Sequence, residues 1–218
     1  MNKKTHIFIL IILLTFTSIV FSQTYKYNIY FKGINGGKAS LSINRINDKV
    51  HAKFLLKTIG VVDKFYSIRD TILVTASYPD YHTISLERII NEGNYHKHIT
   101  FNIDEIDTAL LSNPIRDEYT TMIMLMDSLY ADIDSVQLNL YKKSKEITYS
   151  FVKKKYEDIK INGKNVFCKF YAPSKNSSTK LKKRGGNNLS IWVTNTVPMK
   201  PIIIKFGLKY GKIILKHE

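Results

Sequence analysis

The sequence predicts a mainly β protein, built as a strongly curved antiparallel sheet or incomplete β-barrel of about ten strands with one helix packed on the concave side. Three observations predict it. Apolar and polar residues alternate along most of the chain, which is typical of strands buried on one face. Turn residues separate these segments at intervals of about 8–12 residues. One segment has helical periodicity instead.

The alternation is clearest near the start of the chain, in residues 25–31, 39–43 and 50–56. The glycine-rich segment 33–37 and the pair Asn47-Asp48 favour turns between these segments. We therefore expect an opening meander of three strands. Later strands are expected at residues 69–76, 81–91, 95–102, 136–141, 146–153, 157–161, 165–172, 189–194, 201–206 and 212–217.

A helix is predicted from Pro114 to Tyr130. Asn113 is a residue type that caps helices, and Pro114 suits the first helical position. Apolar residues then recur at spacings of three and four, which places them on one helix face. The members of this face are Ile115, Tyr119, Met122, Met126 and Leu129.

The first 22 residues are typical of a secretory signal peptide. A short basic start precedes an apolar run from Ile7 to Val20, and small residues precede Gln23. The run is shorter than the roughly 20 residues that a membrane-spanning helix needs. We expect residues 1–22 to be removed and residues 23–218 to form a single β-rich domain that does not span a membrane. The expected location is the periplasm, with secretion as the alternative.

The chain is strongly basic, with a net charge of +15 that falls to +13 without Lys3 and Lys4. Such a field attracts anionic partners, of which an anionic envelope surface or a lipid suits an exported protein. Export argues against nucleic acid as the partner. A genome-wide bias towards Lys, Ile and Asn is the alternative explanation of the charge. The oligomeric state is left open.

Isolated residues that often carry chemistry have ordinary explanations here. Cys168 is the single cysteine, so no internal disulfide is expected, and we interpret it as a small buried hydrophobe. His96 and His98 lie two apart on a predicted strand and share a face, but no third metal ligand is fixed. We predict no metal site and no cofactor.

Catalytic motifs are missing from the sequence. There is no Gly-x-Ser-x-Gly elbow, no His-Glu-x-x-His and no phosphate-binding glycine loop. Paired carboxylates of the glycosidase type remain an alternative, with candidates Asp104, Glu105, Asp107 and Asp127. Whether the protein is an enzyme is left open, with preference for no catalysis and no catalytic residue assigned.

Several segments resemble the exported bacterial domain-of-unknown-function family numbered 3108. The closing pattern includes Trp192 and the pair Val197-Pro198; the other similar segments are residues 36–41, 65–70, 162–168 and 211–215. The family often has Asp where this chain has Asn195. The resemblance implies an exported, strand-rich domain without established activity, similar in outline to periplasmic lipoprotein carriers, in which a curved sheet and a helical lid enclose an apolar cavity.

We therefore expect a non-enzymatic binding module of the cell envelope that holds an apolar or lipid-like ligand between the sheet and the helix. The predicted ligand-binding residues are Ile115, Tyr119, Met122, Met126 and Trp192. The alternatives are an envelope glycan hydrolase and an assembly or scaffold protein that binds its partner through an exposed strand edge.

Overall fold

The computed structural model describes residues 21–105, 115–142, 145–175, 177, 189–208 and 211–218. The predicted fold class is confirmed: the described residues form one open antiparallel sheet, with twelve strands rather than about ten. The strands are β1 Phe21–Phe31, β2 Ile34–Ile46, β3 Lys49–Thr58, β4 Arg69–Ser77, β5 Thr83–Glu92, β6 Tyr95–Asn102, β7 Ser135–Lys142, β8 Lys145–Ile161, β9 Lys164–Pro173, β10 Leu189–Thr194, β11 Pro201–Leu208 and β12 Gly211–His217. The helical elements are α2 Gly60–Phe65, α3 Glu118–Met124 and the short 3₁₀ helices η1 Ile103–Glu105 and η3 Ser128–Tyr130.

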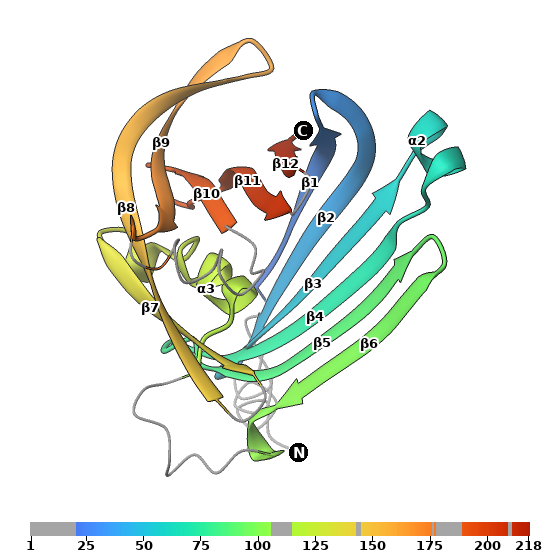
Figure 1. Cartoon of the computed structure of the whole chain (residues 1–218). Helices are drawn as coiled ribbons and strands as arrows, with labels where there is room; N and C mark the ends of the chain where they lie inside the picture. The colour runs from blue at the N-terminus through green and yellow to red at the C-terminus, as the bar shows by residue number, and fades with distance from the viewer. Residues whose placement is uncertain (1–20, 106–114, 143–144, 176, 178–188, 209–210) are drawn as a thin grey trace, which may run out of the picture.

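The sheet is a chain of neighbouring hairpins in the order β6-β5-β4-β3-β2-β1-β12-β11-β10-β9-β8-β7. The first and last strands pair with each other, with Tyr27 opposite His217, and so join the two halves of the sheet. Strands β6 and β7 are the two edges. The sheet curls strongly, so that its halves face each other across a concave interior (Figure 1).

The long strand β8 corrects the sequence prediction, which placed separate strands at residues 146–153 and 157–161. The two segments form one strand, and its pairing with β9 shifts register between Lys153 and Lys155. A bulge of this kind adds one residue and reverses which side chains face inward. The two expected strands are therefore one strand that contains a bulge.

The concave face of the sheet holds the main core. Inward-facing side chains such as Leu41, Phe54 and Val74 are almost fully buried, while their sequence neighbours face outward. The core continues into α3, which lies inside the curve of the sheet (Figure 1). No helix within the described residues is long and apolar enough to cross a membrane.

Helix α3 is shorter than the predicted helix from Pro114 to Tyr130. Pro114 lies outside the described residues, and the cap is Asp117, whose Oδ1 accepts hydrogen bonds from the backbone amides of Tyr119 at 2.7 Å and Thr120 at 3.0 Å. The helix ends at Met124. Leu125 and Met126 stay buried in the segment that follows. The apolar spacing therefore marked burial correctly as far as Met126, but it ran beyond the helix, and Leu129, the last residue of the predicted face, is 61% exposed.

A buried polar network fixes α3 to the sheet. The second carboxylate oxygen of Asp117 accepts from the hydroxyls of Thr83 at 2.8 Å and Thr120 at 2.9 Å. The Thr83 amide donates to the Ile115 carbonyl at 2.9 Å. Since Thr83 begins β5, one carboxylate both caps the helix and sets its position against that strand.

The Asp117→Ala variant is expected to lose about 2–4 kcal/mol of unfolding free energy, because it removes a helix cap and leaves buried donors without an acceptor. Urea denaturation followed by circular dichroism measures the loss. The matched control is Asp132→Ala, an exposed carboxylate, which should change stability by no more than about 0.5 kcal/mol. Equal effects of both substitutions would contradict the anchoring role of Asp117.

Candidate functional site

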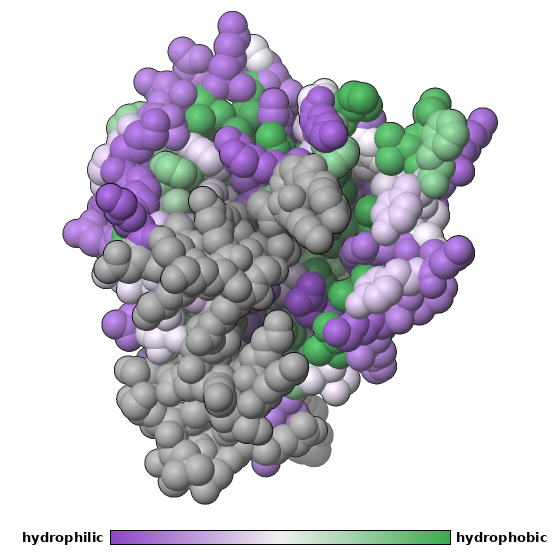
Figure 2. All heavy atoms as spheres, viewed as in Figure 1, coloured by the Kyte–Doolittle hydropathy of each residue, from purple (hydrophilic) through white to green (hydrophobic). Residues whose placement is uncertain are grey.

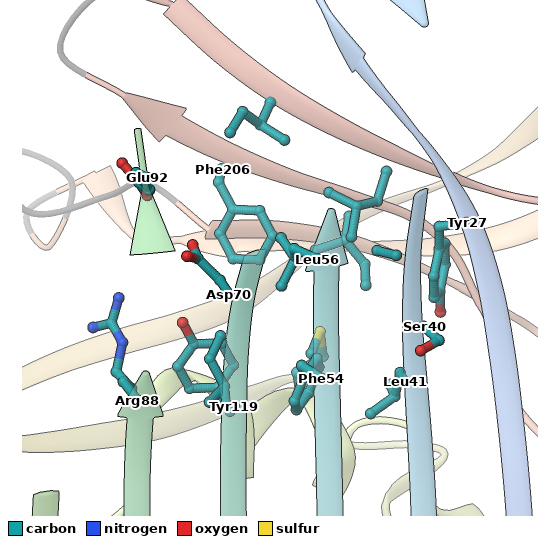
Figure 3. Close-up of a pocket in the computed structure, with 16 residues that line it drawn as sticks. Tyr27, Ser40, Leu41, Phe54, Leu56, Asp70, Arg88, Glu92, Tyr119 and Phe206 are labelled. Atoms are coloured by element: carbon teal, nitrogen blue, oxygen red, sulfur yellow. The ribbon is translucent and has the colours of Figure 1, made fainter. Parts of the chain in front are cut away.

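A cavity of about 120 Å³ lies on the concave face, between the sheet and α3. Its walls are mostly apolar and come from both halves of the sheet and from the helix (Figure 3). The lining apolar residues are Tyr27, Ala39, Leu41, Phe54, Leu56, Ile72, Tyr119, Met122, Ile204, Phe206, Ile213 and Leu215. Cavities of roughly this size in protein cores hold a benzene-sized group, whereas pockets for whole small molecules are larger, about 300–1,000 Å³.

Tyr119 connects the helix to the cavity wall. Its ring lies 5.2 Å from the ring of Phe54 on β3, measured between centroids. Burial raises the pKa of the Tyr119 hydroxyl well above its usual value, so this side chain is neutral over the physiological range. Met122, one helical turn further on, is almost fully buried and lines the same space.

One end of the cavity is polar. Asp70 on β4, Arg88 on β5 and Glu92 at the end of β5 line it, and Figure 3 shows these three charged side chains at the same end. The amide of Asn91 donates to Asp70 Oδ1 at 2.9 Å. Burial raises the pKa of Asp70 to about 6, and the negative charge of Glu92 adds to the increase.

Arg88 supplies a cation to this end of the cavity. Its guanidinium lies 5.9 Å from the centroid of the Tyr119 ring, and it stabilises the ionised form of Asp70 only weakly. Among the described residues, the buried Nε of Arg88 has no hydrogen-bond partner. A buried donor without an acceptor is costly, and the Arg88 guanidinium as a whole carries further N–H donors suited to an acceptor on a bound molecule.

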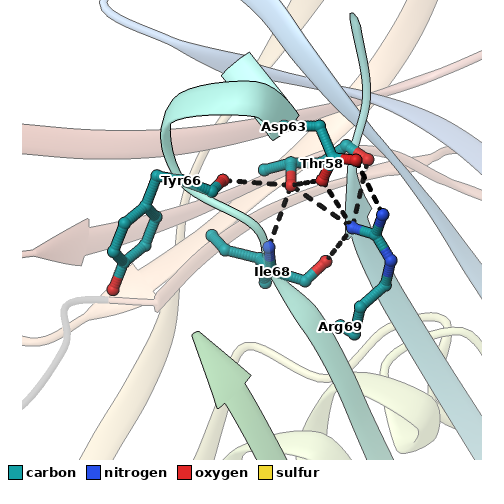
Figure 4. Close-up of polar contacts among 5 residues, drawn as sticks. All are labelled: Thr58, Asp63, Tyr66, Ile68 and Arg69. Carbon is teal, nitrogen blue, oxygen red and sulfur yellow. Dashed lines mark hydrogen bonds and ion pairs between the residues drawn. The ribbon is translucent and has the colours of Figure 1, made fainter. Parts of the chain in front are cut away.

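Arg69, the residue before Asp70, faces the other side of the sheet and contacts helix α2. Arg69 forms a two-pronged ion pair with Asp63 of α2, with N–O distances of 2.7 and 2.8 Å (Figure 4). The Thr58 hydroxyl donates to the same carboxylate at 2.5 Å. The hydrogen bond from Arg69, followed by that from Thr58, holds the pKa of Asp63 well below its usual range. This cluster fixes α2 at the end of β3 and β4.

The structure brings only some of the predicted ligand-binding residues together. Tyr119 and Met122 line the cavity. Ile115 and Met126 are buried in the core but are not among the residues that line it.

Trp192, also a predicted ligand-binding residue, lies on the opposite, convex face of the sheet and does not line the cavity. Its ring stacks on Phe170 at 4.2 Å between centroids, and its indole Nε1 donates to Glu157 at 2.5 Å. The Lys205 ammonium lies 4.2 Å from the same ring. Ile191 and Val193, on either side of it in β10, are the residues that face inward, and both are fully buried.

The other candidates from the sequence lie away from the cavity. Cys168 is a free, buried thiol as predicted, and burial, with a smaller effect of nearby carboxylates, raises its pKa to about 11. His96 and His98 are exposed and contact different residues, Asn91 and Glu87.

The proposed carboxylates do not form the polar end of the cavity either. Asp104 is exposed on η1. Asp127 accepts from the Tyr81 hydroxyl at 2.6 Å and lies 3.7 Å from Arg45. Asp107 and the side chain of Glu105 are outside the described residues.

Sequence reasoning missed Asp70, Arg88 and Glu92 as site residues. Asp70 follows the inward parity of Ile72 and Val74, and Arg88 stands directly opposite Ile72 in the β4–β5 pairing. A charged residue at an apolar position of an alternating strand was therefore the signal that could have found them.

Comparison with protein families matches residues 26–216 to a family described as protein of unknown function, DUF3108. The chain belongs to this family. Among solved structures it is similar to a β-barrel-like protein of domain of unknown function DUF1849 from Brucella abortus, with 10% identity over 93% of this chain and 97% of that chain and a TM-score of 0.44. No curated protein matches the sequence.

The Asp70→Asn variant is expected to change how stability depends on pH. The pKa of Asp70 is higher in the folded protein, about 6, than the roughly 3.9 of an unfolded chain. The native state therefore binds more protons between these values, and stability falls as pH rises from about 4 to 6. After allowance for solvent screening the loss is at most about 1–2 kcal/mol.

Urea denaturation at several pH values measures this dependence. Asp70→Asn should remove the decline and be the more stable protein above about pH 6. Identical pH profiles for the variant and the unmodified protein would contradict the raised pKa of Asp70.

Proposed function

We propose that this protein is a non-enzymatic binding module for a small amphipathic molecule, with its apolar end in the concave cavity. The observation that carries the proposal is a cavity with apolar walls and, at its polar end, the Arg88 guanidinium, whose buried Nε has no hydrogen-bond partner in the part of the chain that the structure describes. The volume of about 120 Å³ favours an aromatic ring or the end of an acyl chain over a whole lipid. The basic, apolar N-terminal segment supports a location outside the cytoplasm, in the cell envelope.

The polar end favours a head group that accepts hydrogen bonds, such as a carboxylate. Arginine presents several N–H donors in a planar arrangement that matches a carboxylate. Asp70 lies at the same end. When Asp70 is ionised, its negative charge repels the negative charge of a carboxylate head group. Since its pKa is about 6, mild acid neutralises it and turns it into a hydrogen-bond donor.

The apolar part of the proposal is tested by reducing the cavity. Ala39 lines the cavity from β2, and Ala39→Leu would place three additional carbon atoms in it. Calorimetric titration with octanoate should show a loss of binding of about tenfold or more, as expected for the exclusion of two or more methylene groups.

The matched control is Ser42→Leu, which adds a similar side chain to the outward face of the same strand. It should leave octanoate binding unchanged. If neither the unmodified protein nor the Ser42→Leu control bound octanoate, octanol or octylamine, the cavity would not be a ligand site.

The head-group assignment is tested with Arg88→Met, which keeps a long side chain and removes the charge. Octanoate binding should weaken by about tenfold or more, the value of a charged hydrogen bond, while octanol binding changes much less. Lys97→Met, at an exposed position of the edge strand β6, is the matched control.

Lowering the pH from about 7.5 to about 5.5 should strengthen octanoate binding by the unmodified protein, because Asp70 gains a proton. This pH effect should disappear in Asp70→Asn. Tighter binding of octylamine than of octanoate would show that the carboxylates, and not Arg88, select the head group.

A further inference from the structure

Three connections at one end of strands β1–β6 carry exposed apolar side chains. They are the β1–β2 turn, helix α2 and the β5–β6 turn, which lie along the same rim of the curved sheet (Figure 1). On α2, Phe65 is 85% exposed and Val61 68%, Ile34 after the β1–β2 turn is 67% exposed, and Tyr95 after the β5–β6 turn is 52% exposed. We call Phe65, Val61 and Ile34 the apolar rim. Figure 2 shows apolar side chains on the two tips formed by the β1–β2 turn and α2, with hydrophilic side chains beside them.

The exposure of the apolar rim is built into the fold. The Arg69–Asp63–Thr58 cluster holds α2 in place (Figure 4). A Cβ on Gly36 would come within 2.9 Å of the Val62 side chain, so glycine here allows the helix to pack closely on β2. The helix thus turns Val62 towards the sheet and leaves Val61 and Phe65 in solvent. Large apolar side chains fixed outward in this way are typical of a binding surface.

Positively charged side chains lie beside the apolar rim. Lys32 and Lys64 are exposed within the same two tips. A groove of about 530 Å³ lies on the outer face of β1–β4. It is lined by four cationic side chains, Lys26, Lys38, Lys57 and Arg69, and by two acidic ones, Asp70 and Glu218. Glu218 is paired with Lys38, and Asp63 with Arg69. The cations therefore outnumber the acids around the apolar rim and the outer groove.

We propose that the apolar rim docks on the surface of an anionic lipid bilayer. Phe65, Val61 and Ile34 would enter the head-group region, and Lys32 and Lys64 would contact the lipid phosphates. A bilayer fits both observations, since apolar insertion and attraction between lysines and anionic lipids act together at membrane surfaces. The surface adjoins the cavity, because the Tyr66 hydroxyl beside the rim donates to Glu92 at its polar end, at 3.3 Å.

Vesicle co-sedimentation of the mature protein tests this docking. The probes are vesicles of phosphatidylcholine alone and of phosphatidylcholine with about one third phosphatidylglycerol, at low and high salt. Binding should require the anionic lipid and should weaken at high salt. Lys64→Gln should reduce the affinity by about fivefold, as expected for one lysine near an anionic surface.

The double variant Val61→Ser and Phe65→Ser should bind anionic vesicles at least about tenfold more weakly. Both side chains are exposed, so folding should be unaffected. The matched control is Leu129→Ser, which is 61% exposed on η3. That helix lies near the β4–β5 turn, at the other end of these strands, where the Tyr130 hydroxyl donates to the Pro79 carbonyl at 2.8 Å. The control should bind like the unmodified protein.

Three results would overturn the proposal: equal binding to neutral and anionic vesicles, no loss in the double variant, or a dimer that the double variant abolishes. The last would make the apolar rim an interface between two copies of the chain. The experiments distinguish a failure of the membrane-docking proposal from a failure of the proposed ligand site in the cavity. Ala39→Leu should keep vesicle binding while losing octanoate, and the double variant should keep octanoate binding while losing vesicles.

Discussion

The structure depends on the need to cover the apolar concave face of an open sheet. An antiparallel sheet with one apolar face is stable only when that face is buried against another element. Here the sheet curls around its own core, and α3 with the buried segment after it fills much of the interior. The Asp117–Thr83 hydrogen bond ties the helix to the beginning of β5. The cavity lies beyond it, towards the end where β5 terminates at Glu92.

Asp70 and Arg88, at the polar end of the cavity, reduce the stability of the folded sheet. Burying a carboxyl group raises its pKa because the charged form is destabilised, as at Asp70. The buried Nε of Arg88, which has no hydrogen-bond partner within the described ranges, adds a second cost. Proteins commonly give up stability of this kind at functional sites. The combination of both costs at one end of one cavity is the main reason to regard this region as a binding site.

The period-two alternation made most of the strands predictable, because one face of the sheet is buried throughout. The prediction went wrong where local geometry departs from regular alternation. The bulge between Lys153 and Lys155 was interpreted as a gap between two strands, and the buried segment at Leu125 and Met126 was interpreted as more helix. Trp192 shares its face of β10 with the polar residues Ser190 and Thr194, so the alternation of Leu189, Ile191 and Val193 already indicated that Trp192 faces outward.

The site itself was harder to predict than the fold, because its polar residues come together only through strand pairing. Asp70 and Arg88 lie on neighbouring strands, and nothing in their linear spacing connects them. Tyr119 and Met122 were predictable because helical periodicity places them on one face. Local patterns therefore found the two cavity residues on α3, whereas the residues that the strands contribute required knowledge of which strands are adjacent.

Arg69 and Asp70 show how one strand serves the two proposed surfaces. As consecutive strand residues they point to opposite faces. Arg69 holds α2, and with it the apolar rim, through its ion pair with Asp63, while Asp70 lines the polar end of the cavity. The distance between the two surfaces is thus fixed by the backbone of β4. An amphipathic molecule leaving a bilayer docked at the rim would meet the polar end of the cavity first, where its head group could remain near water while its apolar end entered.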